Sequence, residues 1–296
     1  MSYLPGDRSM SIIVNPHASG FGAEISGVDL RQPLNAETYT EIESALSRHG
    51  VIYFRDQPLN EAQQEAFIRW FGPPNALARQ LNNARMKNPY FYDVSNVDED
   101  GKIMMEDHER RLYLKANMFW HTDMSMRQPP ARVTALNAIV LPEADPPDTE
   151  FADMRAAWEA LPPDQQQALE PLRVVHSVYA SRSKVGYTNF NEETRQLLPP
   201  TEHPLVRTHA GSGRKNLYIG AHASHISGMD EDEGKALLET LTEFSTQPRF
   251  RYAHKWQPHD LLVWDDSCTL HRSTPFDDQK YRRELRWCSA RELEPI

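Results

Sequence analysis

The segments FRYAHKW (residues 250–256), DLLVWDD (260–266), CTLHRS (268–273) and RELRWCSA (283–290) decide the fold. Each is a short run rich in β-branched and aromatic residues, and turns separate one run from the next, which is typical of short strands. The run ARVTALNAIVL (131–141) adds a longer strand. Many short strands in the second half predict a sandwich or barrel with helices packed outside, so the expected fold class is mainly β with flanking helices.

The first third of the chain predicts smaller strand and helix units. GFGAEISGVDL (20–30) alternates as a strand does, and AETYTEIESALSRH (36–49) has helical spacing that ends at a glycine. VIYFRDQ (51–57) is β-rich. After it, Asn60 is a suitable N-cap with Gln63 at the third helical position, which predicts a helix.

The middle of the chain is less regular. Residues 73–118 lack a sustained period and contain several prolines, which predicts a long loop region, and we expect a lid over 76–116. VVHSVYAS (174–181) predicts a strand, and residues 230–247 predict a helix. We expect all 296 residues, 1–296, to form one domain.

Composition limits the possible partners. The formal net charge is −10, and Lys and Arg are scattered, which argues against nucleic acid and favours a small ligand. No apolar stretch has the length of a membrane span, and the N-terminal residues lack the pattern of a signal or transit peptide, so a cytoplasmic protein without a membrane partner is the default expectation. A homo-oligomer is compatible with the sequence, which does not decide the oligomeric state. One local cluster, Lys280, Arg282, Arg283 and Arg286, indicates an anionic ligand if it lines a pocket.

Two cysteines, Cys268 and Cys288, are too few for a disulfide framework or a cysteine-rich metal site, so any metal must be bound by histidine and carboxylate. His121 and Asp123 would share one face of a strand because strand side chains alternate. His271, at the end of a later strand, qualifies as a third ligand for iron(II). Chance alone predicts about one His-x-Asp pair in a chain of this composition, and an exposed polar turn is the alternative.

Longer motifs resemble a known family. FWHTD (119–123), DTEFADMRAAWEALP (148–162), PLVRTHAGSGRKNLYIGAHASHISGM (204–229), DLLVWDDSCTLHR (260–272) and YRRELRW (281–287) are similar to the taurine and 2,4-dichlorophenoxyacetate 2-oxoglutarate dioxygenases. The likeness spans the chain. The segment at 204–229 and VSNVDEDGK (94–102) look closer to the phenoxyacetate branch.

The resemblance implies a double-stranded β-helix, or jelly roll. His121, Asp123 and His271 would be the catalytic residues that bind Fe(II), with 2-oxoglutarate and O2 as co-substrates. The carboxylate of Asp123 indicates oxygen transfer, since related halogenases have a small residue there. Thr149 and an arginine after the distal histidine would bind the far carboxylate of 2-oxoglutarate, for which a guanidinium is well suited.

Two registers are open for that arginine. Matching the letters RREL selects Arg283 and puts Trp287 where relatives carry a second, substrate-binding arginine, whereas the spacing from His271 selects Arg282 and Arg286. We prefer Arg283, because alternation then places Arg283 and Trp287 on one face of the strand. Trp287 would either wall an aromatic substrate or simply pack in the core.

Four residues are candidates for contact with substrate: Asn117, Arg286, His209 and His222. A loop asparagine and structural histidines are the alternative interpretations. The expected substrate is a small anion, an aryloxyalkanoate cleaved at its ether to a phenol. A sulfonate, a sulfate ester or another small carboxylate is the alternative, followed by a non-catalytic anion-binding jelly roll and a zinc hydrolase.

Overall fold

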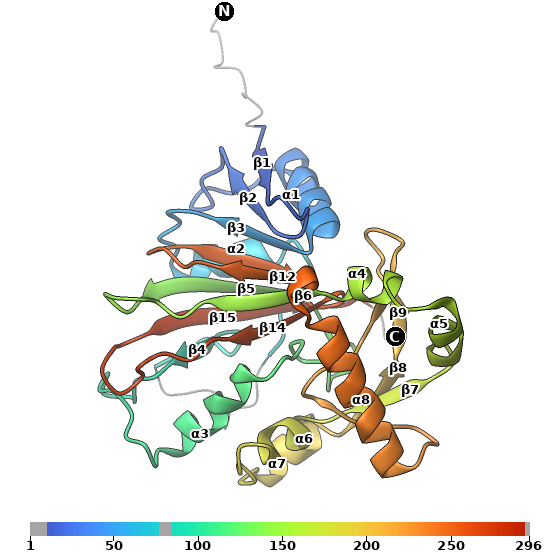
Figure 1. Ribbon diagram of the computed structural model, residues 1–296. Coiled ribbons are helices and arrows are strands. Elements are labelled where there is room, and N and C mark those ends of the chain that lie inside the picture. Colours follow the sequence, from blue (N-terminus) through green and yellow to red (C-terminus); the bar gives the residue numbers. More distant parts are fainter. Residues whose placement is uncertain (1–10, 77–84, 294–296) are drawn as a thin grey trace, which may run out of the picture.

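The computed structural model describes residues 11–76 and 85–293, and a large twisted sheet runs through its centre (Figure 1). Strand β2 pairs in parallel with β3, and the other neighbours in this sheet are antiparallel. In order across the sheet, the strands are β1 (Ile13–Pro16), β2 (Ala23–Ser26), β3 (Val51–Phe54), β13 (Leu261–Asp265), β5 (Ala131–Val140), β15 (Glu284–Arg291) and β4 (Tyr92–Ser95).

A second, antiparallel sheet faces the first and consists of β12 (Arg251–His254), β6 (Thr149–Asp153) and β14 (Thr269–Ser273). Large aromatic side chains fill the space between them: Phe151 of the small sheet packs with Trp264 and Trp287 of the large one. Two facing sheets with an apolar layer between them form the predicted jelly roll.

Alternation along β3 sends its side chains to two different cores. Tyr53 packs between the sheets, whereas Ile52 and Phe54 face outward. On that outer face they are covered by α1 (Ala36–His49) and α2 (Glu61–Ile68). The predicted helix over 36–49 is confirmed, and so is the N-terminus of α2, where Asn60 and Gln63 form a reciprocal capping box.

The remaining elements form a layer beside the small sheet (Figure 1). A three-stranded sheet and the hairpin of β9 and β10 lie here, with helices around them. The elements are α4 (Met154–Glu159), α5 (Pro163–Leu169), β7 (Arg173–His176), α6 (Val178–Ser183), α7 (Glu192–Leu197), β8 (Thr201–Pro204), β9 (Val206–Thr208), β10 (Lys215–Leu217), β11 (Ala223–Ile226), α8 (Glu231–Ser245) and η3 (Pro248–Phe250).

Two sequence predictions are wrong in part. The strand expected over 174–181 ends at His176, and α6 follows it. The long loop expected over 73–118 contains β4, α3 (Glu109–Lys115) and the short helix η2 (Ala116–Met118). Part of the expected lid, residues 77–84, lies outside the described residues, so the lid stays a prediction. Among the described residues, no helix combines the length and apolar character needed to cross a bilayer.

Gln64 ties α2 to the strands beneath it. Its buried amide donates to the backbone carbonyls of Ala135 on β5 (3.2 Å) and Arg286 on β15 (3.0 Å), and its oxygen accepts from Nε of Arg286 (2.7 Å). A single side chain therefore links α2 to two strands of the large sheet.

Replacing Gln64 by leucine should lower the free energy of unfolding by about 2–4 kcal/mol, because two buried carbonyls and a buried guanidinium lose a partner. Urea denaturation measures the loss. Gln167→Leu, on the exposed side of α5, is the matched control and should stay within about 0.5 kcal/mol of the parent. Equal midpoints for the two variants would contradict this reading of Gln64.

Candidate active site

His121 and His271 come from distant parts of the chain and face each other across an isolated antiparallel bridge. The N–H of His121 donates to the carbonyl of His271 (3.0 Å), and the N–H of His271 donates to that of His121 (2.8 Å). Residues paired in this way project side chains to the same side. The two imidazole centroids are 4.2 Å apart.

A turn, and not the alternation of a strand, directs the side chain of Asp123 toward the two histidines. The expected strand through His121 and Asp123 is a single bridge at His121, followed by a turn in which Met124 has a φ of 50°. The turn brings Asp123 Oδ1 to 3.7 Å from Nε2 of His121 and to 3.7 Å from Nε2 of His271. The three candidate ligand atoms all lie within 4.8 Å of one another.

Neighbouring groups orient two of these side chains. Nδ1 of His121 donates to the carbonyl of Phe119 (2.7 Å), which leaves the lone pair on Nε2, the nitrogen that faces Asp123. The indole N–H of Trp287 donates to Asp123 Oδ2 (2.8 Å), so Oδ1 is the oxygen left for a metal. The backbone N–H of Asp123 donates to Asp266 Oδ1 (3.0 Å).

The protonation of the histidines suits a metal site. Burial lowers the pKa of His121, and it holds the pKa of His271 well below its usual value. Both imidazoles are therefore neutral near pH 7, the form that binds a metal. Two imidazole nitrogens and one carboxylate oxygen on one side of an ion leave the other side open, a donor set that fits iron(II).

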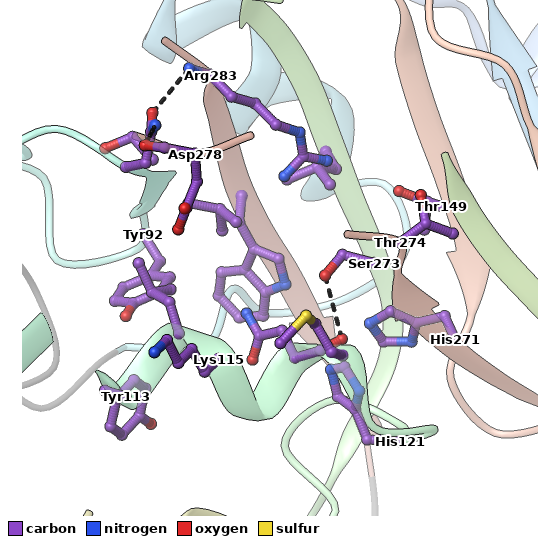
Figure 2. Close-up of a pocket in the computed structure, with 18 of the residues that line it drawn as sticks. Tyr92, Tyr113, Lys115, His121, Thr149, His271, Ser273, Thr274, Asp278 and Arg283 are labelled. Atoms are coloured by element: carbon purple, nitrogen blue, oxygen red, sulfur yellow. Dashed lines mark hydrogen bonds between the residues drawn. The ribbon is translucent and has the colours of Figure 1, made fainter. Parts of the chain in front are cut away.

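The triad opens into a cavity of about 380 Å³. Figure 2 shows His121 and His271 on one side of it and Arg283 reaching in from another element. Most of the wall is apolar or aromatic, and the cationic groups on it are Arg111, Lys115, Arg182 and Arg283. The apolar and aromatic lining consists of Tyr92, Val94, Met104, Tyr113, Leu114, Met118, Met124, Leu136, Trp264, Pro275, Phe276 and Trp287.

Arg283 lies on the same face of the chain as Trp287, as the register that matches the letters RREL predicted. It lines the cavity together with Trp287 and Thr149, whereas Arg282 lies outside the cavity and pairs with Glu284. Burial lowers the pKa of Arg283 to about 10, and its Nε has no hydrogen-bond partner within the described chain. The hydroxyl of Thr149 accepts from the indole of Trp256 (3.1 Å). A buried, unpartnered guanidinium beside a hydroxyl is suited to a carboxylate.

Of the four predicted substrate contacts, only Asn117 lines the cavity. Arg286 points to the opposite face of β15, where Gln64 binds it, so the structure does not place it in the cavity. His222 lies edge-on to His121, with 5.9 Å between ring centroids, but behind the cavity wall. It supports the metal ligand by packing and does not reach the substrate space.

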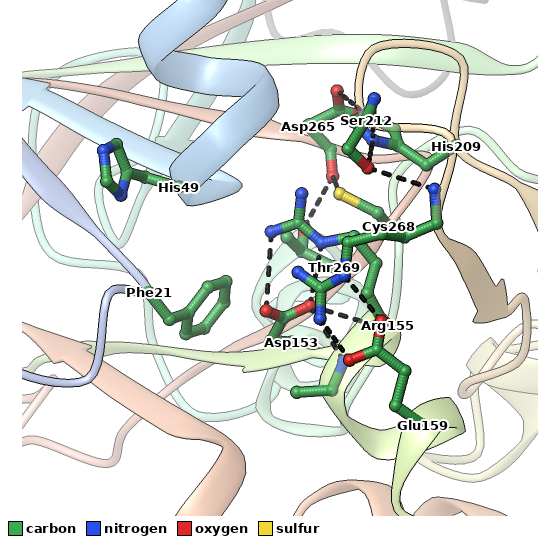
Figure 3. A network of polar contacts seen from close by, with 12 residues as sticks. Phe21, His49, Asp153, Arg155, Glu159, His209, Ser212, Asp265, Cys268 and Thr269 are labelled. Atoms are coloured by element: carbon green, nitrogen blue, oxygen red, sulfur yellow. Dashed lines mark hydrogen bonds and ion pairs between the residues drawn. The ribbon is translucent and has the colours of Figure 1, made fainter.

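His209 belongs to a separate polar network (Figure 3). Its Nε2 donates to Asp265 Oδ2 (2.9 Å), and its Nδ1 contacts the hydroxyl of Ser212 (2.7 Å). His209, Asp265 and Cys268 offer a second cluster of metal-binding atom types. The hydrogen bond between imidazole and carboxylate already satisfies both groups there. The structure therefore places His209 outside the cavity of the triad, and its contact with substrate stays a prediction.

Sequence reasoning missed two residues of the site, Asp266 and Arg182, and one contact, that of Trp287 with Asp123. Asp266 is fully buried and forms hydrogen bonds with Thr122, Asp123, Thr134 and Trp264. The sequence feature that could have indicated its role is an acidic residue at the end of an apolar strand. The contact of Trp287 with Asp123 has no signal in the sequence. Arg182 lines the cavity from α6, one residue beyond the strand expected over 174–181.

Comparisons with known proteins agree with this geometry. A model of the family "Taurine catabolism dioxygenase TauD, TfdA family" matches residues 14–289. The α-ketoglutarate-dependent 2,4-dichlorophenoxyacetate dioxygenase of Cupriavidus pinatubonensis is 45% identical over 279 residues, which cover 94% of this chain and 96% of that protein. The (S)-phenoxypropionate/α-ketoglutarate dioxygenase of Sphingobium herbicidovorans is 34% identical, covering 89% of this chain and 90% of that protein.

A solved structure is similar over the same extent. The crystal structure of AAD-2 in complex with Mn(II) and N-oxalylglycine superimposes with a TM-score of 0.87 at 37% identity, covering 97% of this chain and 98% of that one. Agreement over nearly the whole chain argues against a non-catalytic anion-binding jelly roll and against a hydrolase. The chain belongs to the TauD, TfdA family and is a 2-oxoglutarate-dependent non-haem iron dioxygenase.

Proposed function

We propose that the protein hydroxylates an aryloxyalkanoate at the carbon that carries the ether oxygen. The observation that carries this proposal is one apolar, aromatic cavity that joins the His121, Asp123 and His271 group to buried cations. Its size and lining suit a ligand with one aromatic ring and one negative charge.

The reaction consumes one 2-oxoglutarate and one O2 per substrate. One oxygen atom enters succinate as CO2 leaves, and the other becomes the new hydroxyl of the substrate. The product is a hemiacetal, which breaks its bond to the aryl oxygen and yields a phenol and an oxo acid. His121, Asp123 and His271 would hold Fe(II), which supplies the activation of O2.

Arg283 and Thr149 would bind the far carboxylate of 2-oxoglutarate. Both are buried and line the same cavity as the triad. The guanidinium fork can make two charge-assisted hydrogen bonds to a carboxylate, and the hydroxyl can donate a further one. Arg283 needs such a ligand because it is a buried cation without an ion-pair partner among the described residues.

A sulfonate or sulfate ester is the second candidate substrate. The cations on the wall attract any small anion, whereas a flexible alkyl chain has less to gain than an aryl ring from walls made of Tyr92, Tyr113 and Trp287. The aromatic lining therefore favours the aryloxyalkanoate.

We keep as further proposals one domain over 1–296, a lid over 76–116, a cytoplasmic location and a homo-oligomer.

Substrate-dependent succinate formation should occur with iron(II), ascorbate, 2-oxoglutarate and an aryloxyacetate or aryloxypropionate. His121→Ala should abolish it, since a metal ligand is removed. A panel that adds taurine and alkyl sulfates measures the choice of substrate. Turnover of the sulfur compounds alone would overturn the aryloxyalkanoate proposal and keep the enzyme class.

Arg283→Gln should raise the KM for 2-oxoglutarate about 10–100-fold, because charge-assisted hydrogen bonds of about 1.5–3 kcal/mol are lost. Initial rates at varied 2-oxoglutarate measure this change. Arg282→Gln removes the same charge one residue away, on a half-exposed side chain outside the cavity, and is the control. A larger effect of Arg282→Gln would favour the other register.

Trp287→Phe should weaken metal binding about 10-fold, since it removes the hydrogen bond to Asp123 Oδ2 and keeps an aromatic ring in the wall. Calorimetric titration with Mn(II) measures the affinity. Trp158→Phe, in a different buried cluster, controls for the loss of ring size. If Trp287→Phe keeps the parent metal affinity, the contact with Asp123 is structural only.

A further inference from the structure

Two buried guanidinium groups line the cavity without an ion-pair partner among the described residues, and the proposed function uses only one of them. Arg283 is assigned to 2-oxoglutarate. The other is Arg182 on α6, whose residue is 7% exposed. Buried arginines outside the cavity have their donors taken up by the protein: Arg155 pairs with Asp153, and Arg286 is bound by Gln64 and the carbonyl of Leu59. A buried cation that faces a cavity with donors left over needs another cause.

The side chain of Arg182 is fixed in place, but its charge is not neutralised. Its Nη2 donates to Asn117 Oδ1 (3.2 Å), and its guanidinium carbon lies 4.1 Å from the centroid of the Tyr113 ring. Nε is buried and has no hydrogen-bond partner within residues 11–76 and 85–293. An amide and an aromatic face orient the guanidinium plane and leave donor atoms for a ligand.

Arg182 lies near the metal ligands. It lines the same cavity as His121, Asp123 and His271, and its hydrogen-bond partner Asn117 lies four residues before His121 in the chain. Figure 2 shows Tyr113, on which Arg182 stacks, across the cavity from Thr149. Arg182, on α6, and Arg283, directly before β15, therefore reach the cavity from different elements.

The other groups that could receive the anion are less suitable. Arg111 makes a two-bond ion pair with Asp278 (2.8 and 2.9 Å). Trp287, at a position of β15 that faces the cavity, carries no charge, and its N–H is used by Asp123. Lys115 is partly exposed on α3 and carries a mobile, well-hydrated charge. Arg182 alone among these is desolvated, oriented and unpaired.

We propose that Arg182, oriented by Asn117 and Tyr113, binds the anionic head group of the primary substrate. This inference rests on the proposed function, since it identifies the residue that selects an anion in the same cavity. The carboxylate of an aryloxyalkanoate would take the free donors of the guanidinium, and its ring would lie along the aromatic wall. A sulfate or sulfonate head group could accept from the same donors, so the experiment compares a carboxylate ligand with a sulfate ligand.

The experiment is a calorimetric titration of the full chain loaded with Mn(II) and N-oxalylglycine. The titrants are 2,4-dichlorophenoxyacetate, its neutral primary amide and hexyl sulfate. Arg182→Gln should raise the Kd of the carboxylate about 10–100-fold and leave that of the amide within about twofold. Arg182→Lys should recover part of the loss, because the charge returns without the planar fork.

Two variants control for charge and for the competing cation. Arg195→Gln removes a positive charge from the exposed face of α7 and should change no Kd. Lys115→Gln tests the other cation of the wall and should change the Kd less than Arg182→Gln. The affinity for N-oxalylglycine, measured first, shows whether each variant keeps an intact cavity.

The outcomes separate the inference from the proposed function. Equal losses for carboxylate and amide, no loss in Arg182→Gln, or a larger loss in Lys115→Gln would overturn the role of Arg182. If the parent protein binds hexyl sulfate but not the aryloxyacetate, and Arg182→Gln weakens that binding, the aryloxyalkanoate proposal fails and the role of Arg182 stands. A parent protein that binds neither anion overturns both.

Discussion

The site depends on one pair of backbone hydrogen bonds, the reciprocal contact of His121 with His271 at 3.0 and 2.8 Å. This bridge fixes two candidate metal ligands from distant segments on the same side of the backbone. Asp123 then needs only one turn to reach both imidazoles, and Asp266 and Trp287 hold it there. Because these partners lie on β15 or directly follow β13, the candidate metal site is supported by the sheets of the jelly roll rather than by mobile loops.

Unpaired charge explains how one cavity can receive two anions. Arg283 and Arg182 are both buried, and neither has an acidic partner among the described residues, whereas Arg111 in the same wall is neutralised by Asp278. A cation kept out of water and left unpaired is costly, so its natural partner is a ligand that arrives during function. The placement of these charges, rather than the fold, determines which molecules the cavity accepts.

The sequence predicted most strands and the orientation of β15, because alternation with period two is a local property that packing reinforces. It therefore placed Arg283 and Trp287 on the cavity side, but the same rule shows that Arg286 faces α2, where Gln64 binds it. The strand expected at His121 and Asp123 is instead a turn, stabilised by the distant Asp266. Nothing near Arg182 in the sequence indicates its burial, which results from the packing of α6 over the cavity.

A crystal structure of this protein grown with Mn(II) and N-oxalylglycine tests the central claim most directly. Our account predicts an ion bound by His121, Asp123 and His271, with the far carboxylate of N-oxalylglycine on Arg283 and Thr149, while Arg182 remains free for a second anion. An ion held instead by His209, Asp265 and Cys268, or the far carboxylate of N-oxalylglycine bound to Arg182, would contradict it.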